Sequence, residues 1–152
     1  MTTTVSHRYL LLLAAALTWL LMIPTAPFAA VANSTLSQYL YLFFSPVCHQ
    51  QAERCFSYHG LPFAVCARCF GIYAGFFMGL LGSILLRRTR RIILNHPRII
   101  LLFILPMAVD VFMPNNEWSR FITGLIASFP IAFLVHCAVE EIDFNILRRV
   151  PR

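Results

Sequence analysis

Four long apolar stretches dominate this chain of 152 residues. They cover residues 9–32, 63–86, 99–113 and 120–139, and a helix needs roughly 20 residues to cross a bilayer. Only 12% of the residues are charged, whereas a soluble domain carries about 25%. This composition excludes a water-soluble globule. We therefore predict a single all-α membrane domain over residues 1–152, built as a polytopic transmembrane helical bundle with four spans.

The first apolar stretch also has the pattern of a signal peptide. His7 and Arg8 supply a short basic region before the apolar run, and residues 30–32 form a small-residue cleavage pattern. Cleavage there would leave three spans. We favour an uncleaved span over residues 9–32, because the apolar run continues to nearly the length that a spanning helix needs.

The arginine positions set the expected orientation. The net charge is +6, and every basic residue apart from the histidines is arginine. Arginines gather in the loop 87–98 and the tail 140–152, whereas the loop 33–62 contains only Arg54. By the positive-inside rule, both termini and the loop 87–98 are predicted to be cytoplasmic, and the loop 33–62 extracytoplasmic. Within that loop, residues 39–44 are too short to span and are expected to lie along the outer interface. The positive charge therefore orients the protein in a lipid bilayer, and no nucleic-acid partner is expected.

Four of the five cysteines lie in or beside the outward loop, with two histidines between them. The candidate metal ligands are Cys48, His49, Cys66 and Cys69, with His59 and Cys55 as further possible ligands. Cys66 and Cys69 form a C-x-x-C pair at the start of the second span, where the helix dipole and free N–H groups stabilise a thiolate. Metal ligands and redox thiols both need this property. Cys137, deep in the fourth span, is expected to be a packing residue.

Three interpretations of these cysteines compete. A zinc site would take Cys66 and Cys69 as one pair and Cys48 with His49 or His59 as the other, because Zn²⁺ prefers a tetrahedral set of thiolates and imidazoles. A membrane thiol–disulfide oxidoreductase would use Cys66 and Cys69 as its catalytic pair and a quinone as electron acceptor. Two static disulfides would instead indicate a non-catalytic structural subunit. We rank the zinc site, structural or ion-handling, first.

Helical projection gives the second span two different faces. At about 100° per residue, Cys66, Cys69 and Tyr73 share one face. The opposite face carries a stripe of glycines, Gly71, Gly75 and Gly79. Such a stripe lets a neighbouring helix approach closely, so these glycines are predicted to pack against another span.

Charged residues are expected to gather beneath the cysteines. Asp110 lies near the outer end of the third span, and an acid in a span normally faces the bundle interior with a partner. Arg68 and Arg120 are placed at a similar depth, so we predict that Asp110 pairs with one of them. The predicted polar pocket comprises Glu53, Arg54, Arg68, Asp110 and Arg120. It would either bind a small ion or proton or fix the register of the helices.

The order of these residues resembles a prokaryotic membrane-protein family catalogued as a domain of unknown function. The resemblance rests on Cys48-His49-Gln50, Glu53-Arg54 and Cys66-Ala67-Arg68-Cys69-x-Gly71-x-Tyr73-x-Gly75, and it continues to about residue 135 with Asp110, Asn116, Arg120, Thr123 and Gly124. Ala52 stands where the family generally has proline, and Cys55 where it has serine. The family pattern thus implies a set of Cys48, His49, Cys66 and Cys69 without Cys55, which suits zinc better than two disulfides. It also implies a location in the prokaryotic cytoplasmic membrane.

Overall fold

The computed structural model describes residues 7–32, 35–86, 92–93, 95–96, 98–112 and 116–149, with side chains described as far as residue 141. The elements are α1 (His7–Val31), α2 (Thr35–Phe44), the 3-10 helix η1 (Ala52–Arg54), β1 (Ser57–Tyr58), β2 (Leu61–Pro62), α3 (Ala67–Leu85), α5 (Ile99–Phe112) and α6 (Glu117–Arg149). The expectations for loop residues 87–91 and for the terminal residues 1–6 and 150–152 lie outside the described residues.

Helices form at all four apolar stretches, but they differ in length. Three of them, namely α1, α3 and α6 as far as Glu141, are long and apolar enough to cross a membrane. Helix α5 has 14 residues, which gives about 21 Å at about 1.5 Å per residue, whereas the hydrocarbon core is about 30 Å thick. The fold is therefore a mostly helical one with three candidate spans and a short apolar helix, and the fourth span stays a prediction.

The helix bounds differ from the expected spans at three places. Helix α3 begins at Ala67, four residues later than expected, because Cys66 takes an extended conformation (φ −65°, ψ 158°). Helix α6 continues to Arg149, so the segment 140–149, expected as a tail, extends the last helix. Residues 35–44, expected as part of a loop, form α2. The segment that carries the cysteines is therefore shorter than expected and lies between two helices.

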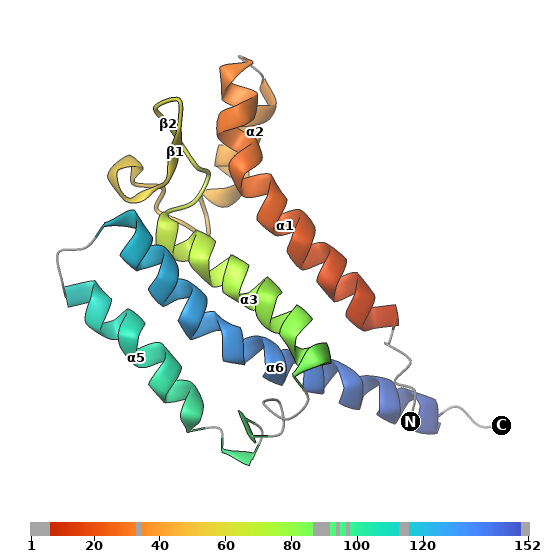
Figure 1. Cartoon of the computed structure of the whole chain (residues 1–152). Coiled ribbons are helices and arrows are strands. Elements are labelled where there is room, and N and C mark those ends of the chain that lie inside the picture. Colours follow the sequence, from red (N-terminus) through yellow and green to blue (C-terminus); the bar gives the residue numbers. More distant parts are fainter. Residues whose placement is uncertain are drawn as a thin grey trace.

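A small hairpin departs from the expected all-α class. Strand β1 pairs antiparallel with β2, with Tyr58 opposite Leu61. The turn residues His59 and Gly60 have φ angles of 50° and 78°, and positive φ at both central positions is typical of a type I′ turn. Glycine adopts such angles without a steric penalty. The hairpin lies beside the N-terminal end of α3 (Figure 1).

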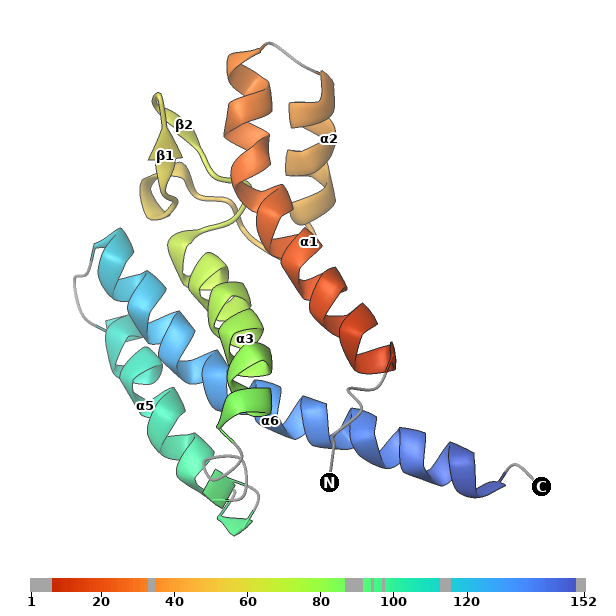
Figure 2. The same ribbon diagram turned by 45° about the vertical axis from the view of Figure 1, so that its right-hand side comes forward.

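The helices pack in the spatial order α5, α6, α3 and α1, with α2 folded back on α1 (Figures 1 and 2). Helix α1 runs antiparallel to α3, and near the start of α1 the Tyr9 hydroxyl donates to the Leu80 carbonyl at 2.5 Å. Helix α5 runs antiparallel to α6, because the Ser119 hydroxyl at the start of α6 donates to Asp110 near the end of α5. The starts of α3 and α6 and the end of α5 therefore meet at one end of the bundle.

Glycines of α3 bring it against the backbone of α6. A Cβ atom added at Gly71, Gly75 or Gly79 would overlap the backbone carbonyl oxygens of Phe121, Leu125 or Phe129, respectively. Both sets have a spacing of four residues and ascend together along the chain, as two parallel helices in register require. The glycine stripe thus lies in the interface between α3 and α6.

A proline in α1 frees a carbonyl that binds the cysteine loop. Pro27 has no N–H, so the carbonyl of Ile23, four residues earlier, lacks its helical donor. The Ala64 N–H donates to this carbonyl at 3.4 Å. Ile23, Ala64 and Cys66 also belong to one buried apolar cluster. Helix α1 therefore holds the segment that leads into α3.

Candidate functional site

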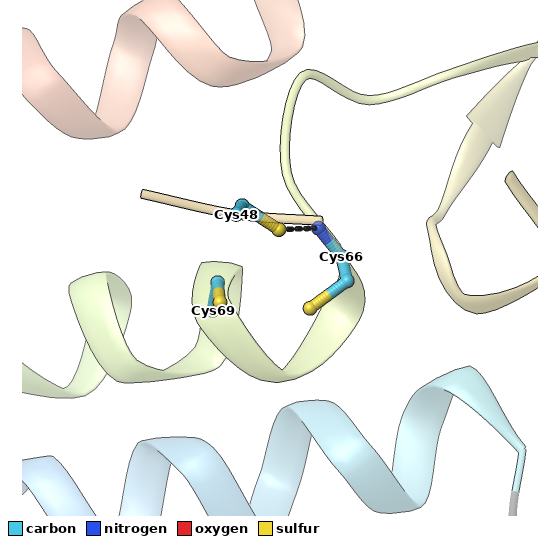
Figure 3. Close-up of side chains that lie close together, drawn as sticks. All are labelled: Cys48, Cys66 and Cys69. Carbon is cyan, nitrogen blue, oxygen red and sulfur yellow. Dashed lines mark hydrogen bonds between the residues drawn. The ribbon is translucent and has the colours of Figure 1, made fainter. Parts of the chain in front are cut away.

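Three cysteines lie together where the loop meets the start of α3 (Figure 3). The sulfur atoms of Cys48, Cys66 and Cys69 all lie within 4.8 Å of one another. Cys48 and Cys66 are buried, whereas Cys69 is partly buried. Cys66 directly precedes α3 and Cys69 lies in its first turn, so the C-x-x-C spacing turns both sulfurs toward Cys48. The result is a compact group of three soft sulfur ligands.

Gln50 fixes the position of the loop that carries Cys48. Its side-chain amide donates to the carbonyl oxygens of Tyr41 and Ala64, both at 2.8 Å. One carbonyl belongs to α2 and the other to the segment before Cys66, so a single side chain ties together the two approaches to the cluster. Gln50 also takes a positive φ of 49°. In the sequence, Gln50 stands out only as part of the Cys48-His49-Gln50 motif, which gives no sign of this role.

Replacing Gln50 by alanine is expected to loosen the cluster. The change removes two hydrogen bonds, and each contributes about 0.5–1.5 kcal/mol to stability. We expect the free energy of unfolding to fall by about 1–3 kcal/mol and the alkylation rate of Cys66 to rise. Gln51→Ala, at an exposed neighbour, is the matched control. Equal alkylation rates in the two variants would contradict the role given to Gln50.

Among the three clustered cysteines, the surroundings favour a negative charge at one sulfur atom, that of Cys48. The pKa of the Cys48 thiol is lowered to about 2, because the thiols of Cys66 and Cys69 and the backbone N–H groups of Cys66 and Gln50 donate hydrogen bonds toward its sulfur. The Cys66 N–H lies 3.2 Å from that sulfur. The pKa of the Cys66 thiol is raised, first by its hydrogen bond to Cys48. Cys48, which precedes a loop rather than a helix, is therefore the thiol of the group whose surroundings favour ionisation.

Cys55 lies outside the group of three. Its thiol is buried and donates to the Gln51 carbonyl at 3.1 Å. Burial, followed by the charges at Cys66 and Cys48, raises its pKa to about 12. A thiol that resists ionisation is a poor metal ligand and a poor nucleophile. The position of Cys55 agrees with the accessory role that the family resemblance implied.

Alkylation of Cys55 in the metal-free protein is expected to stay slow up to about pH 10, because only the thiolate reacts. The raised pKa has a consequence for stability. Below pH 9 the thiol is protonated in both the folded and unfolded chains, but between pH 9 and 12 only the unfolded chain ionises it. Stability should therefore fall as pH rises through this window. Peptide mapping of the alkylated protein and unfolding curves measure both effects, and Cys55→Ala should remove this part of the pH dependence.

Neither of the two candidate histidines is part of the sulfur cluster. His49 is exposed, and its Nδ1 accepts a hydrogen bond from the Gln51 N–H at 3.3 Å. His59 is exposed in the turn of the hairpin, with its ring edge-on to Tyr58. Among the described residues, neither joins the cysteine group. The structure thus assembles three of the four expected ligands and leaves His49 beside them.

A polar cavity of about 120 Å³ lies next to the cysteines. It is enclosed by side chains from the loop, the start of α3, the end of α5 and the start of α6. The lining residues are His49, Arg54, Cys66, Arg68, Asp110, Val111 and Arg120. Four of the five residues expected in a polar pocket line this cavity, whereas Glu53 is exposed in η1 and does not. The cavity and the cysteine cluster share the wall formed by Cys66.

An ion pair closes one side of the cavity. The Arg68 Nη2 atom lies 2.6 Å from Asp110 Oδ2, and the Ser119 hydroxyl donates to Oδ1 of the same carboxylate at 2.5 Å. The Asp110 side chain is only 4% exposed and that of Arg68 is 27% exposed. Arg68 is thus one of the two expected partners that the structure pairs with Asp110, and the contact with Ser119 was not predicted. Ser119 lies one residue before Arg120 in the sequence, and its contact with Asp110 forms because the end of α5 meets the start of α6.

A second polar network, which was not predicted from the sequence, lies at the opposite end of the bundle. The Ser83 hydroxyl is 2.5 Å from His136 Nδ1, and His136 Nε2 is 3.4 Å from a Glu140 carboxylate oxygen. The ring of Tyr9 stacks on His136 with ring centroids 4.1 Å apart. These contacts join α1, α3 and α6. A buried histidine in an apolar span was the available signal, because such residues are rare without a partner.

An apolar cavity of about 420 Å³ lies between α1, α3 and α6. Its walls are formed by Leu12, Ala15, Ala16, Trp19, Ile72, Tyr73, Phe76, Ser128 and Ile131. Tyr73 lies one helical turn after Cys69, so the cavity begins just below the cysteines. The indole N–H of Trp19 is buried and interacts with the Tyr73 hydroxyl. The cavity therefore offers almost wholly apolar walls.

Comparison with known proteins gives a family and two relatives. Residues 48–134 match the family described as predicted membrane protein (DUF2085). An uncharacterized protein of Methanocaldococcus jannaschii is 34% identical over 140 residues, covering 84% of this chain and 89% of that protein. An uncharacterized protein of Methanothermobacter thermautotrophicus is 36% identical over 99 residues, covering 60% of this chain and 86% of that protein. No solved structure matches the chain. The family match includes the three clustered cysteines, Gln50 and the Arg68–Asp110 pair.

Proposed function

This chain belongs to the DUF2085 family of predicted membrane proteins, and on that premise we propose that it holds one zinc ion with Cys48, Cys66 and Cys69. The observation that carries the proposal is the convergence of three sulfur atoms within 4.8 Å of one another. In a tetrahedral site with Zn–S bonds of about 2.3 Å, neighbouring sulfurs are about 3.8 Å apart. Small side-chain rotations would bring the three sulfurs to that spacing.

The chemistry of the donor set fits zinc. Cys48 is poised as a thiolate, and a bound zinc ion would favour loss of the remaining thiol protons at Cys66 and Cys69. Three protein ligands leave a fourth position, which water or the adjacent His49 would fill. With the loop tied by Gln50 and α1, the ion would join the loop to α3. We assign the site a structural or ion-handling role.

We place this site on the outer side of the prokaryotic cytoplasmic membrane. Arginines gather in the loop after α3 and in the C-terminal segment, and positively charged loops stay in the cytoplasm. The starts of α3 and α6, which carry the site, would then face outward. Reporter fusions after Leu86 and before Cys48 should report opposite sides of the membrane.

The test of the zinc proposal is metal content and free-thiol count in protein purified without reductant. We expect about one zinc per chain, and its loss in Cys69→Ser. Cys137→Ser is the matched control, because Cys137 lies outside the cluster, and it should keep the metal. Cys55→Ser should also keep it. Zinc retained at full occupancy in Cys69→Ser would refute the proposal.

The apolar cavity supports a second candidate, a thiol–disulfide oxidoreductase. Oxidation of Cys66 and Cys69 to a disulfide would release two electrons and two protons, which a quinone in the cavity would take up to become a quinol. This candidate ranks second because Cys55 lies apart from the cluster and a second cysteine pair is not assembled.

Turnover separates the two candidates. Metal-free protein that reduces a soluble quinone analogue at the expense of a dithiol, and that stops doing so in Cys69→Ser, would favour the oxidoreductase. Protein that carries neither metal nor exchangeable thiols would instead leave the structural subunit as the function. Either result would overturn the zinc proposal.

A further inference from the structure

The polar cavity beside the cysteines has an excess of positive charge. Three guanidinium groups, those of Arg54, Arg68 and Arg120, and a single carboxylate, that of Asp110, line it. Guanidinium groups stay protonated in proteins. Glu53, the acid of the loop, does not line the cavity. The cavity therefore has two more positive than negative charges in its wall.

The single carboxylate is already engaged by other groups. Arg68 Nη2 binds one oxygen of Asp110 at 2.6 Å, and the Ser119 hydroxyl donates to the other. The Nε atom of Arg68 is buried and has no hydrogen-bond acceptor in the described part of the chain. Because this atom is fully buried, the feature that a ligand in the cavity would balance is the net positive charge of the wall.

The size of the cavity limits the ligand. A volume of about 120 Å³ corresponds to roughly four waters at about 30 Å³ each, and pockets for larger organic ligands are about 300–1,000 Å³. Guanidinium groups present paired donors that match the oxygens of phosphate and carboxylate. Several guanidinium groups around one small space favour a compact anion with oxygens in several directions.

We propose that this cavity binds a tetrahedral oxoanion, either free phosphate or sulfate or the phosphate of an anionic lipid headgroup. The arginines come from the loop, α3 and α6, so the anion would draw three elements together at the outer end of the bundle. Cys66 forms part of the wall, and the bound anion would lie beside its thiol. The binding requires no metal ion and does not rest on the zinc proposal.

The test is native mass spectrometry of the full chain in a neutral detergent, with inorganic phosphate and, separately, with phosphatidylglycerol. We expect one saturable adduct. Arg54→Gln should weaken it at least tenfold and Arg120→Gln likewise, whereas Arg98→Gln, outside the cavity, should leave it unchanged. Arg54 is exposed in η1, so its substitution leaves the Arg68–Asp110 pair intact and remains informative if other variants misfold.

The two probes identify the source of the anion. A phosphate adduct that persists when phosphatidylglycerol is added assigns a free oxoanion, whereas displacement by phosphatidylglycerol but not by phosphatidylcholine assigns a headgroup. Adducts that are equally abundant in Arg54→Gln and Arg98→Gln, or absent with both probes, would overturn the proposal. Repeating the measurement after chelation should give the same adduct, so loss of zinc alone would not affect this result.

Discussion

Gly75→Ala is expected to separate α3 from α6 and to leave little folded protein. The new Cβ would overlap the backbone carbonyl of Leu125 and the hydroxyl of Ser128. The Ser128 hydroxyl can rotate away, but the Leu125 carbonyl belongs to the backbone and cannot, so the two helices must move apart. Overpacking a close interface costs about 1–3 kcal/mol and occasionally more. Because this contact is backbone against backbone, we expect the free energy of unfolding to fall by about 3 kcal/mol or more. Unfolding in detergent measures this loss, and the yield of monodisperse protein gives a second readout.

Gly82→Ala is the matched control for that substitution. Gly82 lies in the same helix, but the atom nearest to its added Cβ is at the end of the Phe129 side chain, 3.3 Å away. An aromatic ring can shift by a few tenths of an ångström, so this variant should fold with nearly normal stability. If both variants fold equally well, α3 and α6 do not approach each other at Gly75 as closely as described.

Asp110→Asn is expected to be the second most damaging change. It removes the negative charge that faces the Arg68 guanidinium at 2.6 Å. Breaking a buried ion pair by removing one partner costs about 3–5 kcal/mol. Because the Arg68 side chain is 27% exposed, water screens part of this cost, and we expect about 2–3 kcal/mol. The measurement is the free energy of unfolding of the purified protein.

A double variant separates the charge from the packing. Apolar replacement of both partners of a buried ion pair is often neutral or stabilising. Arg68→Met with Asp110→Leu should therefore recover most of the stability that Asp110→Asn loses. A double variant that is less stable than Asp110→Asn would show that the site depends on something other than the balance of these two charges.

The apolar stretches predicted the positions of the helices well and their ends less well. Residues 99–113 and the helix Ile99–Phe112 nearly coincide, because Arg98 directly precedes the apolar run and Pro114 directly follows it. Helix α6 exceeds its predicted span because hydropathy falls at Glu140 while helix propensity does not. Helix α3 begins four residues later than the predicted span, because Cys66 is in an extended conformation at the end of the loop. Hydropathy measures burial in lipid, and these ends depend on hydrogen bonds.

The cysteine cluster was predictable in part. The C-x-x-C spacing on a helix start places Cys66 and Cys69 from local geometry alone. The choice of Cys48 over Cys55, and the position of His49 outside the cluster, depend on the path of the loop. Gln50 sets that path by binding Tyr41 and Ala64. Such contacts join residues that are distant in the sequence, and no local pattern encodes them.

The contact between α1 and the cysteine segment has a consequence for how the protein is made. Ile23 and Ala26 are fully buried against the segment that carries Cys48 and Cys66. The ribosome synthesises α1 before the cysteines. The apolar residues of α1 that pack against the cysteine segment are therefore already present when that segment leaves the ribosome. Asp110 is synthesised later and completes the wall of the polar cavity beside Cys66. A protease cut after Ala32 that released α1 would uncover the nascent thiols, so the segment that first reaches the membrane also shields the site while it matures.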